Sequence, residues 1–130
     1  MRLEHVALNV ADPVAFARWY VKNLGFRVVR SSGAPQFAHF MADASGSVLL
    51  EVYLNARVRI PDYFTWYPAN FHIAFASEDV RADRDRLLRA GASLVADVSG
   101  PARPGEDEVV MLRDPWGVPI QLAKRAAPML

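Results

Sequence analysis

Cysteine is absent from this 130-residue chain. Disulfide bridges and thiolate metal sites are therefore excluded, and any bound metal must use nitrogen and oxygen ligands. A charge imbalance is absent as well, because 15 Lys and Arg side chains nearly balance 14 Asp and Glu side chains, for a formal net charge of +1. This balance gives no electrostatic reason to expect nucleic acid or an anionic membrane surface as a partner.

Long apolar runs are also missing, and no segment approaches the roughly 20 residues that a membrane span needs. The N-terminus enters strand-like sequence at once, without the charged lead, apolar core and cleavage site of a secretory signal. Hydrophobic residues at 52% and charged residues at 22% are globular values. We therefore expect a single cytoplasmic domain without membrane association.

Two stretches, Leu3–Val10 and Phe71–Ala76, share an alternation of bulky apolar residues with small or polar ones. Each stretch has a histidine, His5 or His72, on its small-residue side. Period-2 alternation is typical of a strand with one face in a core. A histidine in a row of alanines indicates that the small side lines a cavity. The core face of the second stretch is formed by Phe71, Ile73 and Phe75.

Helix signals follow both stretches. Asp12-Pro13 combines an N-cap carboxylate with a proline at the first helical position, and Gly25 provides the stop. Ser77-Glu78-Asp79 and Gly91 play the same roles for a second helix. The remaining alternating segments predict strands at 26–30, 36–42, 47–54, 93–98, 108–113 and 118–124.

The order of these elements repeats, which predicts an internal duplication. Equivalent landmarks are separated by 67 residues (His5 to His72), 66 residues (Gly25 to Gly91) and 70 residues (Glu51 to Gln121). We therefore predict an α+β fold of two βαβββ modules that form an open, cup-shaped, mixed eight-stranded sheet with the helices outside. The modules are placed at about 1–54 and 70–124, with a linker at 55–69 and a tail at 125–130.

Strand parity places four polar side chains on the face opposite the apolar core residues. They are His5, Glu51, His72 and Gln121. Two imidazoles, a carboxylate and an amide oxygen are a suitable ligand set for one divalent first-row metal ion, such as Ni, Zn, Mn, Co or Fe. A dication in this position would polarise a bound carbonyl.

Simpler interpretations exist for each residue taken alone. A single histidine on a strand is more often a hydrogen-bonded pocket residue than a metal ligand, and a glutamate can occupy an exposed sheet face. His39 has no counterpart in the other module, and we interpret it as structural or pocket-lining. The linker aromatics are interpreted as packing rather than as a substrate wall. They are Tyr63, Phe64, Trp66 and Tyr67.

Five segments together resemble the vicinal oxygen chelate superfamily, which includes glyoxalase I, extradiol dioxygenases, bleomycin and fosfomycin resistance proteins and methylmalonyl-CoA epimerase. The segments are Leu3–Ala7, Leu24–Phe26, Leu50–Val52, Phe71–Ala74 and Asp114–Leu122. The resemblance covers nearly the whole chain. It implies paired βαβββ modules around a metal, and a homodimer with the site at or near the interface.

On the bacterial glyoxalase I pattern, His5, Glu51 and His72 fall on metal-ligand positions, whereas Gln121 replaces the usual glutamate. Glutamine can ligate through its amide oxygen but cannot accept the substrate proton. The resemblance therefore leaves Glu51 as the candidate catalytic base.

Glutathione-dependent relatives have arginine four residues after the first ligand and four before the third, where this chain has Asn9 and Pro68. Asn55, four residues after Glu51, does match. Glutathione is therefore not the expected thiol. The candidate substrate-pocket residues are Asn9, Tyr53 and Asn55.

The resulting expectation is a metal-dependent lyase or isomerase acting on a small oxygen-bearing molecule. Two alternatives stay open. An iron(II) ring-cleaving dioxygenase would match the two-histidine, one-carboxylate count, although extradiol relatives have their carboxylate where Gln121 lies. A non-enzymatic ligand- or antibiotic-binding protein of the bleomycin-resistance kind would use the same cup without metal, although such relatives usually lack the ligand set retained here.

Overall fold

The protein is described by a computed structural model that covers residues 1–100, 105–127 and 129. Residues 101–104, between the strands predicted at 93–98 and 108–113, and residues 128 and 130, in the predicted tail, lie outside the described residues. The chain divides into two compact units, Met1–Pro61 and Asp62–Leu130. The boundary between the units lies inside the predicted linker.

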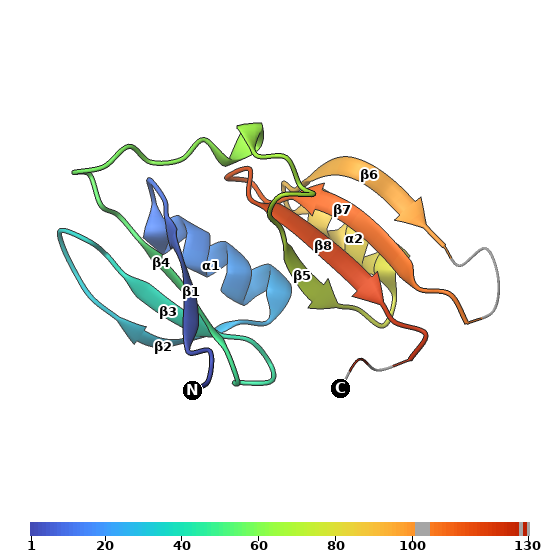
Figure 1. Ribbon diagram of the computed structural model, residues 1–130. Coiled ribbons are helices and arrows are strands. Elements are labelled where there is room, and N and C mark those ends of the chain that lie inside the picture. The colour runs from blue at the N-terminus through green and yellow to red at the C-terminus, as the bar shows by residue number, and fades with distance from the viewer. Residues whose placement is uncertain (101–104, 128, 130) are drawn as a thin grey trace. The chain divides into compact units, whose positions relative to one another are not determined.

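The first unit is a four-stranded sheet with one helix against a face (Figure 1). Its strand order is β1-β4-β3-β2, with β1 parallel to β4 and the other pairs antiparallel. Its elements are β1 (His5–Asn9), α1 (Pro13–Leu24), β2 (Arg27–Ser31), β3 (His39–Ala42) and β4 (Leu49–Tyr53).

Helix α1 begins and ends where the capping signals predict. The Asp12 carboxylate accepts a hydrogen bond of 2.9 Å from the amide of Ala15, and Gly25 ends the helix in the left-handed conformation at φ 70°. Phe16 and Tyr20 stack with ring centroids 4.4 Å apart and are fully buried. The aromatic stripe of α1 therefore fills the core beneath the sheet.

The second unit repeats the same topology, with strand order β5-β8-β7-β6 and β5 parallel to β8 (Figure 1). Its elements are η1 (Tyr63–Thr65), β5 (Ile73–Ala76), α2 (Val80–Arg89), β6 (Ser93–Ser99), β7 (Glu108–Arg113) and β8 (Pro119–Lys124). The α+β fold class and the two βαβββ modules are confirmed. The eight strands hydrogen-bond as two four-stranded sheets, one in each unit.

The turn between β7 and β8 is organised around a buried carboxylate. Asp114, at 1% exposure, accepts hydrogen bonds of 2.9 Å from the amides of Trp116 and Val118. Gly117 completes the turn at φ 89° and donates its amide to the Asp114 carbonyl at 3.0 Å. The motif Asp114–Gly117 is thus a structural turn that sets the start of β8.

Three local predictions differ from the structure. The strand predicted over Phe71–Ala76 begins only at Ile73, because the amide of Phe71 donates to the Tyr67 carbonyl in the preceding turn. The strand predicted at 36–42 begins only at His39, because Phe37 is left-handed at φ 47° and donates its amide to Gly33 in a turn. The irregular linker contains the 3-10 turn η1, which Asp62 caps by accepting from the Phe64 amide at 3.1 Å. Across the described ranges, none of the helices has both the length and the apolar character of a membrane span.

Candidate functional site

In the first unit, His5 and Glu51 lie on one face of the sheet and approach each other. The parallel register pairs Ala7 with Glu51, so Glu51 shares the face of His5, two residues before Ala7. The His5 Nε2 is 3.5 Å from the Glu51 Oε2. The side chains are 36% and 19% exposed, so a ligand from solvent can reach the pair.

The His5 ring is fixed by two further contacts. Its Nδ1 donates to the Glu4 carboxylate at 2.5 Å, and its edge meets the Phe40 ring with centroids 5.8 Å apart at 89°. A neutral imidazole with Nδ1–H engaged has its lone pair on Nε2, the nitrogen that faces Glu51. A carboxylate on the remote nitrogen is the usual support of a metal-ligating histidine.

In the second unit, His72 and Gln121 also belong to one face. The register pairs Ala74 with Gln121, so these two side chains share the face opposite Ile73. His72 immediately precedes β5, and strand alternation extended by one residue assigns it to the same side. The His72 ring is exposed, and its Nδ1 donates to the Pro68 carbonyl at 2.8 Å. This hydrogen bond again leaves Nε2 with the free lone pair.

The two units therefore present matching halves. In each unit, the histidine lies two residues before an alanine, Ala7 or Ala74. That alanine pairs with Glu51 or Gln121 on the last strand of the unit. This register agrees with the predicted faces. The set of four ligands draws on both units, and its assembly stays a prediction.

The donor chemistry fits a first-row dication. An imidazole Nε2 beside a carboxylate oxygen in one half, and an imidazole with an amide oxygen in the other, are ligand types that zinc, nickel, cobalt, manganese and iron(II) accept. Within the part of the chain that the structure describes, no group of three His, Cys, Asp or Glu side chains gathers closely enough to hold a metal alone. Ligation by Gln121 through its amide oxygen stays a prediction.

Two of the predicted pocket residues line a cleft of about 480 Å³ in the first unit. Tyr53 and Asn55 follow Glu51 at two-residue steps, so they continue its sheet face beyond the end of β4. The full lining is Pro35, Gln36, Tyr53, Leu54, Asn55, Ala56 and Arg57. Arg57, which the sequence analysis did not single out, provides a cationic side chain at this cleft.

Asn9 fixes the backbone of Asn55, one of the residues that line the cleft. Its amide nitrogen donates to the Asn55 carbonyl at 3.2 Å, and its oxygen accepts from the Asn55 amide at 2.8 Å. Asn9 is buried, with 8% of its surface exposed. Asn9 therefore holds the backbone of Asn55 at the rim, and direct contact with a substrate stays a prediction.

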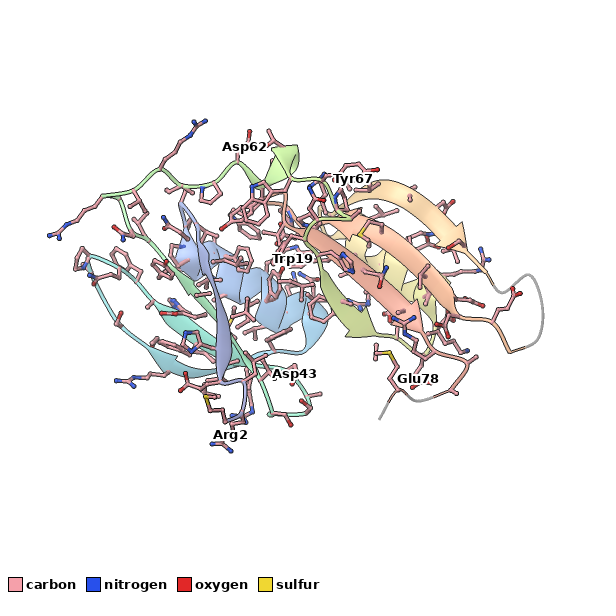
Figure 2. All side chains as sticks on the ribbon, in the orientation of Figure 1. Arg2, Trp19, Asp43, Asp62, Tyr67 and Glu78 are labelled. Carbon is pink, nitrogen blue, oxygen red and sulfur yellow. The ribbon has the colours of Figure 1, made fainter. Side chains whose placement is uncertain are left out.

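His39 agrees with the structural interpretation, and the linker aromatics agree with it only in part. His39 pairs with Val52, on the face opposite Glu51, and its Nδ1 donates to the Phe37 carbonyl at 2.7 Å. Figure 2 labels Asp62 and Tyr67 in the linker. Between them, Tyr63 is buried and packs against Trp66 with ring centroids 4.8 Å apart. Phe64 and Tyr67 are exposed.

Sequence reasoning missed Glu4 and Arg113. Strand alternation assigns neighbouring residues to opposite faces, so nothing in the sequence signals the Glu4–His5 contact. Arg113, the last residue of β7, donates to the carbonyls of Tyr63, Trp66 and Gly117. Those partners are up to fifty residues away, and no local pattern reveals them.

Comparisons with known proteins place these features in a family context. The sequence model described as "Glyoxalase/Bleomycin resistance protein/Dioxygenase superfamily" matches residues 2–122. A lactoylglutathione lyase of Haemophilus influenzae is 25% identical over 126 residues, covering 93% of this chain and 90% of that protein.

Two solved structures share the fold at lower identity. A glyoxalase I mutant from Zea mays matches with a TM-score of 0.75 and 23% identity, over 97% of this chain and 46% of that one. TnmS3, an antibiotic binding protein from Streptomyces sp. CB03234, matches with a TM-score of 0.65 and 21% identity, over 96% of both chains.

Proposed function

The chain belongs to the glyoxalase/bleomycin resistance protein/dioxygenase superfamily, and from this premise we propose that it is a metal-dependent, glyoxalase-like enzyme. The proposed reaction is a lyase or isomerase step on a small oxygen-bearing substrate. The proposed ligands of one divalent metal ion are His5, Glu51, His72 and Gln121. We further propose a homodimer with the site at or near the subunit interface.

The observation that carries this proposal is the His5–Glu51 pair. The imidazole Nε2 faces the carboxylate across 3.5 Å while Glu4 occupies the remote Nδ1. A histidine that served only to pair with Glu51 would need no acceptor on its other nitrogen. With Nδ1–H donated to Glu4, the Nε2 lone pair and the Glu51 carboxylate are two electron-pair donors 3.5 Å apart, an arrangement that a bound metal ion would stabilise. The exposed His72, whose Nδ1 donates to the Pro68 carbonyl, has its Nε2 available for a metal ion and so favours the metal interpretation.

The chemistry divides among the residues by what each can do with a proton. A bound dication would polarise a coordinated carbonyl and acidify the adjacent C–H group. Glu51 is the proposed base, because its carboxylate can accept that proton and return it to a neighbouring carbon. Gln121 can supply only an amide oxygen or an amide N–H, so it can help to position the metal ion or the substrate but cannot transfer a proton.

The cleft beside Glu51 is the proposed substrate site. Tyr53 and Asn55 would contact the part of the substrate remote from the reacting oxygens, and Arg57 favours a substrate that carries a negative charge. Distant similarity to lactoylglutathione lyase supports a lyase, whereas Asn9 and Pro68 at the two expected arginine positions argue against glutathione.

Gln121 is also the observation that favours a second candidate, a ligand-binding protein without catalysis. If the reaction requires a base in the fourth position, its replacement by an amide would leave a site that binds and does not turn over. The likeness to TnmS3 shows a common fold only.

Metal binding is the first test. Protein dialysed against Ni²⁺, Zn²⁺, Mn²⁺ or Fe²⁺ should retain about one ion per chain for at least one of these metals. His5→Ala and His72→Ala should abolish retention, while His39→Ala, a histidine outside the proposed set, should keep it. A protein that retains none of the four metals would overturn the proposal.

Turnover assays then separate the reaction types. Hemithioacetals made with glutathione and with other thiols test glyoxalase chemistry, and oxygen uptake with a catechol tests the dioxygenase alternative. Gain of hemithioacetal turnover in Gln121→Glu would show that one amide separates binding from catalysis. Loaded protein inactive in every assay, even after this substitution, would favour the binding candidate.

A further inference from the structure

The segment that carries His72 into β5 has little regular structure of its own. Between Asp62 and His72 it contains the three-residue 3-10 turn η1 and a hydrogen-bonded turn at 67–71, and β5 begins after the histidine at Ile73. The direction of the His72 ring therefore depends on what fixes this segment. The ring itself is held by the Pro68 carbonyl at 2.8 Å.

One side chain fixes the segment from the sheet. Arg113 donates from Nη1 to the Tyr63 carbonyl at 2.9 Å and from Nη2 to the Trp66 carbonyl at 2.7 Å. Nη1 also donates to the Gly117 carbonyl at 2.9 Å, which joins the segment to the β7–β8 turn. A planar guanidinium with five donors suits three acceptors in fixed directions, and lysine offers no such fork.

Packing continues from this clamp toward His72. Arg113 binds the backbone carbonyl of Trp66, and the Trp66 ring meets the Phe71 ring edge-on with centroids 5.2 Å apart. Phe71 is the residue before His72. Between them, the amides of Asn70 and Phe71 donate to the Tyr67 carbonyl, at 2.9 and 3.4 Å, and so close a turn around Pro68. The acceptor for His72 therefore lies inside a loop fixed at both ends.

We propose that Arg113 is a positioning residue for His72. By holding the Tyr63 and Trp66 carbonyls, it keeps the Pro68 carbonyl at the His72 Nδ1, so that the ring carries its proton on Nδ1 and presents an unprotonated Nε2. Arg113 does not touch the proposed metal or substrate. Its consequence for metal affinity rests on the proposed function, but its effect on the His72 tautomer does not.

The test uses the metal-free protein. Two-bond ¹H–¹⁵N correlation spectra at alkaline pH, where imidazoles are neutral, report which ring nitrogen carries the proton. The wild type should show His72 as the Nδ1–H form. In Arg113→Met the His72 resonances should move toward the Nε2–H form, and Arg113→Lys should fall between, because one ammonium can satisfy only part of the clamp. His5, in the other unit, should not change.

A merely structural role is separated by a matched control. Leu87→Ala removes a fully buried side chain of α2 and destabilises the same unit without touching the clamp. It should leave the His72 nitrogens as in the wild type. If Arg113→Met does not fold, Arg113→Lys carries the test. A folded Arg113 variant that keeps the wild-type His72 nitrogen shifts, or an equal shift in Leu87→Ala, would overturn the inference.

Metal titration provides the second readout. Loss of a group hydrogen-bonded directly to a metal ligand typically lowers affinity by about 10- to 100-fold. Arg113 acts one contact further away, through the position of the Pro68 carbonyl, so Arg113→Lys should lower affinity by at most this factor for whichever ion the wild type retains. A wild type that binds no metal but whose His72 tautomer depends on Arg113 would refute the proposed function and leave the inference intact. Stoichiometric metal binding by the wild type, together with a His72 tautomer that is the same in the Arg113 variants, would refute the inference and leave the proposed function intact.

Discussion

Gly117 offers a quantitative test of how the linker packs on the second sheet. Its φ of 89° is in the left-handed region, and a Cβ at this position would lie 2.6 Å from both the amide nitrogen and the Cδ2 of Phe64. The backbone has little room to retreat, because the Gly117 amide donates to Asp114 and the carbonyl accepts from Arg113. Gly117→Ala therefore meets a backbone penalty and a steric one.

The two penalties can be estimated separately. The left-handed conformation costs an L-residue about 1–2 kcal/mol, and overpacking adds about 1–3 kcal/mol. The free energy of unfolding should fall by about 2–5 kcal/mol, a large part of the roughly 5–15 kcal/mol typical of native domains. With an m-value of about 2 kcal/mol/M, the urea midpoint should fall by about 1–2.5 M.

Equilibrium unfolding in urea, followed by tryptophan fluorescence, measures this shift, because Trp66 and Trp116 flank the contact. Two other glycines separate the terms. Gly25→Ala has a φ of 70° with nothing within 4 Å and should show the backbone cost alone, whereas Gly33→Ala, also open and without positive φ, should show neither cost. A Gly117→Ala midpoint shift no larger than that of Gly25→Ala would refute the packing of Phe64 on the turn.

Three further predictions concern polar groups. Asn9→Leu removes both hydrogen bonds to the Asn55 backbone, so unfolding free energy should fall by about 1–3 kcal/mol in urea titration; an unchanged midpoint would contradict the rim role. Asp114→Ala removes the carboxylate that accepts from the buried Val118 amide and the part-buried Trp116 amide, and should lower the Tm by on the order of 10 °C; a calorimetric change under 2–3 °C would count against this account. Burial acts to raise the pKa of Asp83, but hydrogen bonds from Arg86 and Ser77 and the charge of Arg86 outweigh it, so the pKa is lowered. The resulting stabilisation is present above the unfolded carboxyl pKa of about 3.9 and is lost as pH falls through the lower folded value. The stability advantage of the wild type over Asp83→Asn should therefore shrink between pH 6 and pH 2, and a constant difference would be inconsistent with it.

Strand alternation and capping carry most of what could be predicted from the sequence. The alternation around His5 and His72 predicts two strands, which the structure shows as β1 and β5, and Asp12 and Gly25 bound α1 to within a residue. These signals are local, so a single sequence contains them. The same alternation places Glu51 and Gln121 on the faces where the observed register has them.

The parts that could not be predicted depend on contacts between distant residues. The clamp of Arg113 on Tyr63 and Trp66 joins residues 47 to 50 positions apart, and the sequence shows only an arginine after an apolar strand. Glu4 meets the His5 ring through a side-chain rotation that alternation does not describe. Phe37 delays the start of β3 to His39 through a left-handed conformation that its residue type disfavours.

The central claim, that His5 and His72 bind one metal ion together, is tested most directly by X-ray absorption at the nickel edge of Ni²⁺-loaded protein. Multiple scattering from imidazole counts the histidine ligands. Two imidazoles per nickel are predicted in the wild type and in His39→Ala, and fewer than two in each of His5→Ala and His72→Ala. A wild-type spectrum without imidazole scattering, or an imidazole count that neither substitution lowers, would contradict the account.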